Sequence, residues 1–249
     1  MIGRLKQAGL VWPGVAGLIA LAILLGLGTW QLQRKAWKDA LVRQIDLRVN
    51  GAAKRLDVAA IFATDAAARP LPYERVLVSG KYHHEKERFL FADGREGSGF
   101  HVLTPLEVGP GQVVWINRGY VPAALKEPAK RAAGQIAGVV EVAGLVREQG
   151  DRNAFTPDND VQKNVWHWRD LPALSRSAFG DGKVASAPLA LDASLEPKNP
   201  GGWPRGGTTL LKISNRHLEY AGTWYGLAAT LIGVFFVFAR GRLKAAAAT

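Results

Sequence analysis

The side chain best suited to bind a metal lies at the edge of an apolar segment near the C-terminus. The stretch SNRHLEYAGTWYGLAATLIGVFFVFARGRLK, residues 214–244, contains an uncharged run from Tyr220 to Ala239, and His217 lies just before that run. A neutral imidazole is a good ligand for iron. Two other roles are open to a histidine in this position: it can cap the helix, or it can lie among lipid headgroups.

The residues that follow His217 at helical spacing would suit a planar ligand. At about 100° per residue, Ala221, Trp224 and Ala228 fall on the same face as His217. Ala221 would leave room for a flat group, Trp224 would pack against it, and Arg216 is close enough to pair with a propionate. The spacing alone does not decide between this arrangement and the simpler roles.

Glycines of the same run define another face. Gly222, Gly226 and Gly233 fall within a wedge of about 40°, and the small-xxx-small pair Gly222/Gly226 would let a second helix approach closely. We expect that partner to be an apolar run near the N-terminus. His217 would then point away from the contact between the helices, toward lipid or a ligand.

Two segments are long enough to cross a membrane. The first, Leu10–Trp30, is uncharged and would reach roughly 30 Å as a helix. It is too long for the apolar part of a signal peptide and lacks a following A-x-A site, so we interpret it as an uncleaved anchor. The chain therefore divides into an N-terminus (1–9), a first span (10–30), a domain (31–219), a second span (220–239) and a tail (240–249).

The sequence indicates two membrane spans more directly than it indicates which side of the membrane the large domain occupies. Lys and Arg flank both spans on both sides, so the positive-inside count does not decide, whereas long loops translocate largely regardless of charge. This favours cytoplasmic termini with the large domain outside, and a cytoplasmic domain stays open as the alternative.

The segment between the spans is rich in β-strand patterns. After a helical stretch with Trp30, Trp37, Leu41 and Ile45 on one face, five segments from residue 73 to 148 show alternating or β-branched residues bounded by Gly, Pro and Asp. A short helix is expected near 169–178, another strand near 186–193, and a mobile loop over 195–207. The fold class predicted is an α+β membrane protein, with two transmembrane helices flanking a β-rich soluble domain whose antiparallel or mixed sheet could close into a barrel.

Several function classes find no support. The chain has no cysteine, which excludes disulfides, thiolate metal sites and cysteine nucleophiles. In HHEKER the second zincin ligand position holds Arg88, and His83 and His84 would point to opposite faces of a strand. Both are interpreted as ordinary surface or turn residues, whereas His101 and His167 are expected to be structural. The net charge of +11 is dispersed rather than gathered into a nucleic-acid-binding pattern.

The motifs in their order along the chain resemble the surfeit locus protein 1 family of membrane factors for cytochrome c oxidase assembly. The matching pieces are LGTWQLQRKAWKDALV, YERVLVSGKY, GFHVLTPLEV, VVWINRGYVP, FTPDNDVQKNVWHWRDLPAL and NRHLEYAGTWYGLA, which together cover nearly the whole chain. The resemblance implies a non-enzymatic protein of the bacterial inner membrane with its main domain in the periplasm.

The resemblance also implies a ligand and partners. Bacterial members are associated with haem a bound through the histidine at the second span, here His217, and the spacing described above would put Ala221, Trp224 and Arg216 around it. The expected partners are haem a synthase, oxidase subunit I and membrane lipid, and nucleic acid is not expected. A membrane scaffold that holds oxidase subunits without a cofactor is the alternative. The match includes Trp30, Gln31, Arg34 and Trp37, and Asn117, Arg118 and Gly119, without assigning them roles.

Overall fold

The computed structural model describes residues 3, 8–62, 65–94, 97–150, 152–209 and 214–248. It separates into two compact units, one formed by the two ends of the chain up to Gln44 and from Lys212, and the other by Ile45–Leu211. We describe them in turn as the helix pair and the β-domain.

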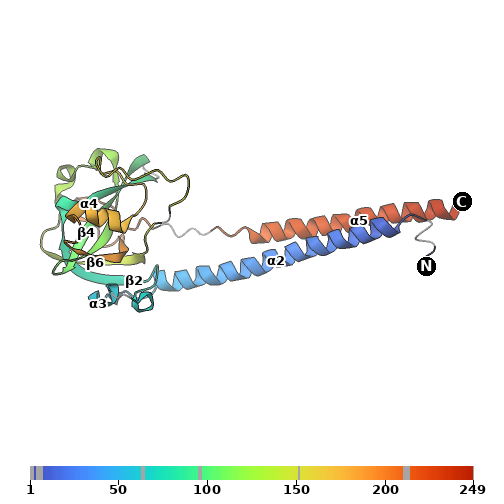
Figure 1. The fold of residues 1–249 in the computed structure, drawn as a ribbon, viewed down its shortest axis with the longest axis horizontal. Coiled ribbons are helices and arrows are strands. Elements are labelled where there is room, and N and C mark those ends of the chain that lie inside the picture. Colours follow the sequence, from blue (N-terminus) through green and yellow to red (C-terminus); the bar gives the residue numbers. More distant parts are fainter. Residues whose placement is uncertain are drawn as a thin grey trace. The chain divides into compact units, whose positions relative to one another are not determined.

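The helix pair consists of α2 (Val11–Val49) and α5 (His217–Ala248), which lie side by side in Figure 1. Both are long and apolar enough to cross a membrane, and only 6% and 11% of their most apolar windows are buried. The core helix of a soluble protein would be largely buried, so this exposure fits contact with lipid. The two expected apolar helices are confirmed. The amphipathic stretch after Trp30 continues α2 without a break.

The two helices meet along a different face of α5 from the one predicted. Ala221 and Ala228 are buried, at 1% and 2% exposure, whereas Gly222, Gly226 and Gly233 would find no atom within 4 Å of an added Cβ. The prediction that the glycine face of α5 forms the contact is therefore wrong.

Glycines do shape the contact, but they belong to α2. An added Cβ on Gly28 would lie 2.8 Å from the ring of Tyr225, and Gly14 and Gly17 lie against Phe235. Aromatic side chains of α5 thus fill the space that the small residues of α2 leave. Large-into-small packing of this kind gives the van der Waals contact on which association in lipid depends.

The β-domain is built around a small closed barrel. Its strands are β1 (Lys54–Arg55), β2 (Arg75–Tyr82), β3 (Arg88–Gly94), β4 (Gly97–Gly109), β5 (Gln112–Pro122), β6 (Val139–Arg147) and β7 (Ala185–Ala193). Their order is β1-β2-β6-β7-β5-β4-β3, and a further pairing of β2 with β4 closes five of them into the barrel. The β1–β2 and β5–β7 pairs are parallel and the others antiparallel. The predicted mixed, barrel-like sheet is confirmed.

Burial along the strands explains the barrel. In β2, Val76 and Val78 alternate with more exposed residues and point into the core. Strand β5 is buried on both faces, because one face fills the barrel and the other lies under α4 (Leu171–Phe179). There Trp115 packs with Leu174 and Trp166 in a second core. The remaining short helices are α3 (Val58–Ile61), η1 (Ala66–Ala68), η2 (His84–Lys86), η3 (Ala123–Leu125), η4 (Pro128–Gly134) and η5 (Pro200–Gly202).

The glycine- and proline-rich segment 195–207 is fastened to the barrel, contrary to the prediction of a mobile loop. Tyr120 and Arg205 exchange two backbone hydrogen bonds of 2.9 Å, and Asn199 bonds Pro204 within the segment. The two adjacent histidines, His83 and His84, occupy the turn that begins η2 and not a strand, which agrees with their interpretation as surface or turn residues.

Candidate functional site

His217 is the first residue of α5 and is hydrogen-bonded to Gln31 of α2. Its Nδ1 lies 2.7 Å from Oε1 of Gln31, and the side chain is half-buried. An amide oxygen can only accept, so Nδ1 carries the proton. In the neutral ring, Nε2 then keeps its lone pair, and no described residue donates a hydrogen bond to it.

This pairing is one that a metal-ligating histidine needs. Such a histidine usually donates its second ring N–H to a carbonyl or carboxylate, which fixes the tautomer and the orientation of the ring. Gln31 does this for His217 across 186 residues of sequence. Gln31 belongs to the run after the first span and His217 to the motif at the second, so the helix pair brings residues of the two motifs into contact.

The predicted neighbours of His217 share its face, but that face is turned toward α2. Ala221 is buried in the helix contact and Trp224 is half-buried. Ala221 therefore leaves no open space beside His217 in this arrangement. The prediction that His217 points away from the contact is wrong, because helical spacing groups residues on a face without saying which face a neighbour covers.

Charged groups surround this end of the helix pair. Arg216 donates from Nε and Nη2 to Glu219 Oε2 at 2.9 and 2.7 Å, and both side chains are about two-thirds exposed. The Glu219 hydrogen bond raises the pKa of Arg216. Exposed pairs of this kind contribute little to stability, so the guanidinium can exchange Glu219 for another carboxylate. Asp39 accepts bonds from Lys35 (2.6 Å) and from Asn215 (2.7 Å), which adds a second link between α2 and the residues before α5.

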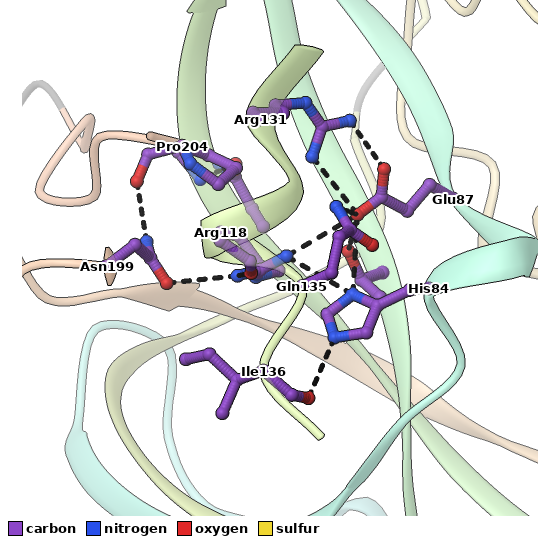
Figure 2. A network of polar contacts seen from close by, with 12 residues as sticks. His84, Glu87, Arg118, Arg131, Gln135, Ile136, Asn199 and Pro204 are labelled. Atoms are coloured by element: carbon purple, nitrogen blue, oxygen red, sulfur yellow. Dashed lines mark hydrogen bonds and ion pairs between the residues drawn. The ribbon is translucent and has the colours of Figure 1, made fainter. Parts of the chain in front are cut away.

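A second polar cluster is buried in the β-domain around Glu87 (Figure 2). Arg131 donates to both carboxylate oxygens, at 2.5 and 3.3 Å, and Arg118 donates to Oε1 at 3.4 Å. His84 Nδ1 lies 3.5 Å from the same oxygen, and its Nε2 donates to the Ile136 carbonyl. Burial raises the pKa of Glu87, but hydrogen bonding by His84 and Arg131 and the charges of both arginines outweigh it and lower the pKa to about 2.

This cluster gives a structural role to the residues of the NRGYVP motif. Arg118 bonds Glu87, the Gly134 carbonyl and Asn199, so it ties β5 to the end of η4 and to the segment 195–207. Asn117 donates to buried Asp192 and accepts from the Gly119 amide. Gly119 has a φ of +117°, and a Cβ there would lie 1.8 Å from a backbone oxygen of the fastened segment. The sequence alone did not reveal Glu87, since a single carboxylate among scattered charges carries no pattern.

A sequence profile of the SURF1 family matches residues 18–229. The chain belongs to the SURF1 family. The SURF1-like protein of Monosiga brevicollis is 36% identical over 94% of this chain and 89% of that protein. Surfeit locus protein 1 of Homo sapiens is 36% identical over 87% of this chain and 74% of that protein, and its counterpart in Takifugu rubripes is 34% identical over 88% and 93%.

Members of the SURF1 family are cytochrome c oxidase assembly factors that are not enzymes, which agrees with the resemblance noted in the sequence. Across the described residues, no three His, Asp or Glu side chains gather as a metal centre. A lone histidine can still hold iron when a porphyrin supplies four more nitrogen ligands. In this SURF1 protein, His217 with its Gln31 partner has the chemistry for that role.

Proposed function

We propose that this SURF1 protein binds haem a and passes it to oxidase subunit I, with Nε2 of His217 as the iron ligand. The observation that supports this most directly is the 2.7 Å bond from Nδ1 of His217 to Gln31, which fixes the ring in the tautomer that leaves Nε2 unprotonated. The half-buried position at the end of the pair would partly shield the iron while keeping it reachable for a partner.

Other residues of the helix pair would orient the cofactor. Trp224 follows Ala221 by about one turn of α5 and offers an aromatic surface. Arg216 would release Glu219 and bind a propionate of the haem instead. When bound, haem a would supply the redox-active iron that the oxidase requires. Ala221 would stay in the contact between the helices and act through packing only. Delivery then follows from relative affinity, because the ligand moves to the protein that binds it more tightly.

We further propose the bacterial inner membrane as the location, with both termini cytoplasmic and the β-domain in the periplasm. Two spans put both ends of the chain on one side, and long segments between spans translocate largely regardless of charge. Haem a synthase would be the donor and lipid would surround the exposed apolar faces. A reporter enzyme that works only in the periplasm should be inactive when it is fused to either terminus. An active fusion would show that the proposed orientation is wrong.

The ligand assignment is tested by absorption spectroscopy of detergent-purified full-length protein from cells that make haem a. We expect a Soret band with haem a in the pigment extract, and loss of most of it in His217→Ala. His83→Ala removes a histidine of the β-domain and should keep the band. Exogenous imidazole should restore pigment to His217→Gly. An unchanged band in His217→Ala would eliminate His217 as the main ligand.

A scaffold without a cofactor is the second candidate. The glycine face of α5 supports it, because Gly222 and Gly226 have open space beside them and would admit another membrane helix. Haem-free protein that copurifies with oxidase subunits, and loses them in Gly226→Leu, would favour the scaffold over the haem carrier.

A further inference from the structure

The β-domain contains a large cleft that has no role in the proposed haem site at His217. It has a volume of about 1100 Å³, above the usual range for small-molecule pockets of roughly 300–1,000 Å³. Its walls come from β3, β4 and β5, from the end of β6 and the residues that follow it, and from residues 72–73, 167–169, 195 and 205–208. All of these lie within one compact unit, so the cleft belongs to the β-domain itself.

The inner wall of the cleft carries excess positive charge. Arg169 has a side chain only 9% exposed and donates to Asp192 Oδ1 at 2.9 Å, while Arg147 approaches the other oxygen of Asp192 at 3.6 Å. Two guanidinium groups therefore share one buried carboxylate. Asp192 itself is not a lining residue, and the acidic residues that do line the cleft, Asp93 and Glu148, are exposed to solvent, which screens their charge.

Arg169 also has an unused donor. Its Nε is buried, and no hydrogen-bond partner is found for it among the described residues. Buried polar atoms in folded proteins almost always have a partner, and an acceptor such as a water or an anion is one explanation for an exception. A planar guanidinium with a free N–H edge suits a carboxylate or phosphate oxygen.

Flat side chains line the rest of the cleft. Phe91 is 45% exposed, and its ring centroid lies 6.0 Å from that of His167. Tyr120 and Trp168 are further lining residues. His101 faces the cleft as well, and burial lowers the pKa of its imidazole, which keeps the ring neutral and able to act as a hydrogen-bond donor or acceptor. Exposed aromatic faces beside fixed cations favour a ligand that is flat and anionic.

We propose that this cleft is a second binding site, which takes a planar aromatic molecule bearing carboxylate groups. A carboxylate would bind Arg169 and Arg147, and the flat body would lie against Phe91 and His167. Porphyrins with free propionates belong to this class, and the choice of a porphyrin as the physiological ligand rests on the proposed function. The site would hold the cofactor by its propionates and ring, independently of the iron bond at His217.

The test uses full-length protein in detergent with metal-free coproporphyrin, a soluble porphyrin that carries four carboxylates and cannot bind a histidine through iron. Fluorescence anisotropy should show saturable binding, equally tight in wild type and in His217→Ala. Phe91→Ser and Arg147→Gln should each weaken binding by about tenfold or more. A porphyrin with cationic substituents in place of the carboxylates should bind at least tenfold more weakly.

Matched controls lie outside the cleft. Phe155 is 94% exposed and Arg152 is half exposed. Phe155→Ser and Arg152→Gln therefore make the same two substitutions at surface positions, and they should leave coproporphyrin binding unchanged. Thermal melting of each variant shows whether the domain stays folded. Equal losses in control and cleft variants, equal binding of the cationic porphyrin, or loss in His217→Ala alone would each overturn the proposal. An unchanged Soret band in His217→Ala, with intact coproporphyrin binding, would refute only the role of His217.

Discussion

Replacing Glu87 with glutamine should strongly destabilise the β-domain. The Arg118 and Arg131 side chains are each 1% exposed and Glu87 is 2% exposed, so the substitution leaves two buried positive charges without their counter-charge. Breaking a buried pair in this way typically costs about 3–5 kcal/mol, out of a total that is of order 5–15 kcal/mol for a folded domain.

The pKa of Glu87 gives a second, independent magnitude. The folded-state pKa of about 2 lies below the ordinary value of 4.5, a difference that corresponds to about 3 kcal/mol. The folded state binds fewer protons than the unfolded state between these values, so stability rises with pH there. The contribution is fully present above about pH 4.5 and is lost as the pH falls toward 2.

The assay is pulse proteolysis of full-length protein in detergent at graded urea concentrations, at pH 7 and across pH 2–5. We expect Glu87→Gln to lower the urea midpoint strongly at pH 7 and to flatten the acid dependence. Glu85→Gln is the matched control, since Glu85 is 64% exposed and forms a surface pair with His83, and should change stability by less than about 1 kcal/mol. The reasoning would be refuted if the free energy of unfolding of Glu87→Gln lay within about 1 kcal/mol of the wild-type value. It would also be refuted if the stability of the variant fell between pH 5 and pH 2 as that of the wild type does.

Three further predictions follow from the packing. Gly119→Ala should destabilise the β-domain by at least about 3 kcal/mol in the same assay, because both its φ of +117° and its close neighbour oppose a Cβ, whereas Gly97→Ala, with a φ of +92° and open space, should cost only the backbone strain. Ala228→Phe should broaden the α2–α5 distance distribution measured by electron resonance between spin labels, since Ala228 is 2% exposed, and Gly222→Phe on the open face should not. Gln31→Leu should reduce bound pigment at unchanged expression, while Gln31→Glu should retain it, because a carboxylate also accepts the imidazole proton; equal pigment in Gln31→Leu would separate this residue from cofactor binding.

The absence of cysteine makes the labelling experiments direct. Any introduced cysteine is the only thiol in the chain, so spin labels report from the chosen positions alone. The same property allows accessibility labelling of the β-domain to test its side of the membrane.

Sequence patterns predicted the elements well where the signal is local. Two uncharged runs predicted the long helices α2 and α5, because the length needed to cross a bilayer can be read from composition. Alternation and β-branched residues predicted the strands and the mixed barrel, because a strand buried on one face repeats every two residues. The family motifs indicated His217 as the candidate haem ligand without any knowledge of its contacts.

The tertiary structure decided what depends on neighbours distant in the chain. Helical spacing placed His217, Ala221 and Trp224 on one face, but only the packed pair showed that α2 covers this face, since the aromatic residues of α5 fit the glycines of the first helix. The Gln31–His217 bond joins residues 186 positions apart. The buried charge cluster around Glu87 and the cleft in the β-domain likewise exist only once the barrel closes, because periodicity carries no information about which distant side chains meet.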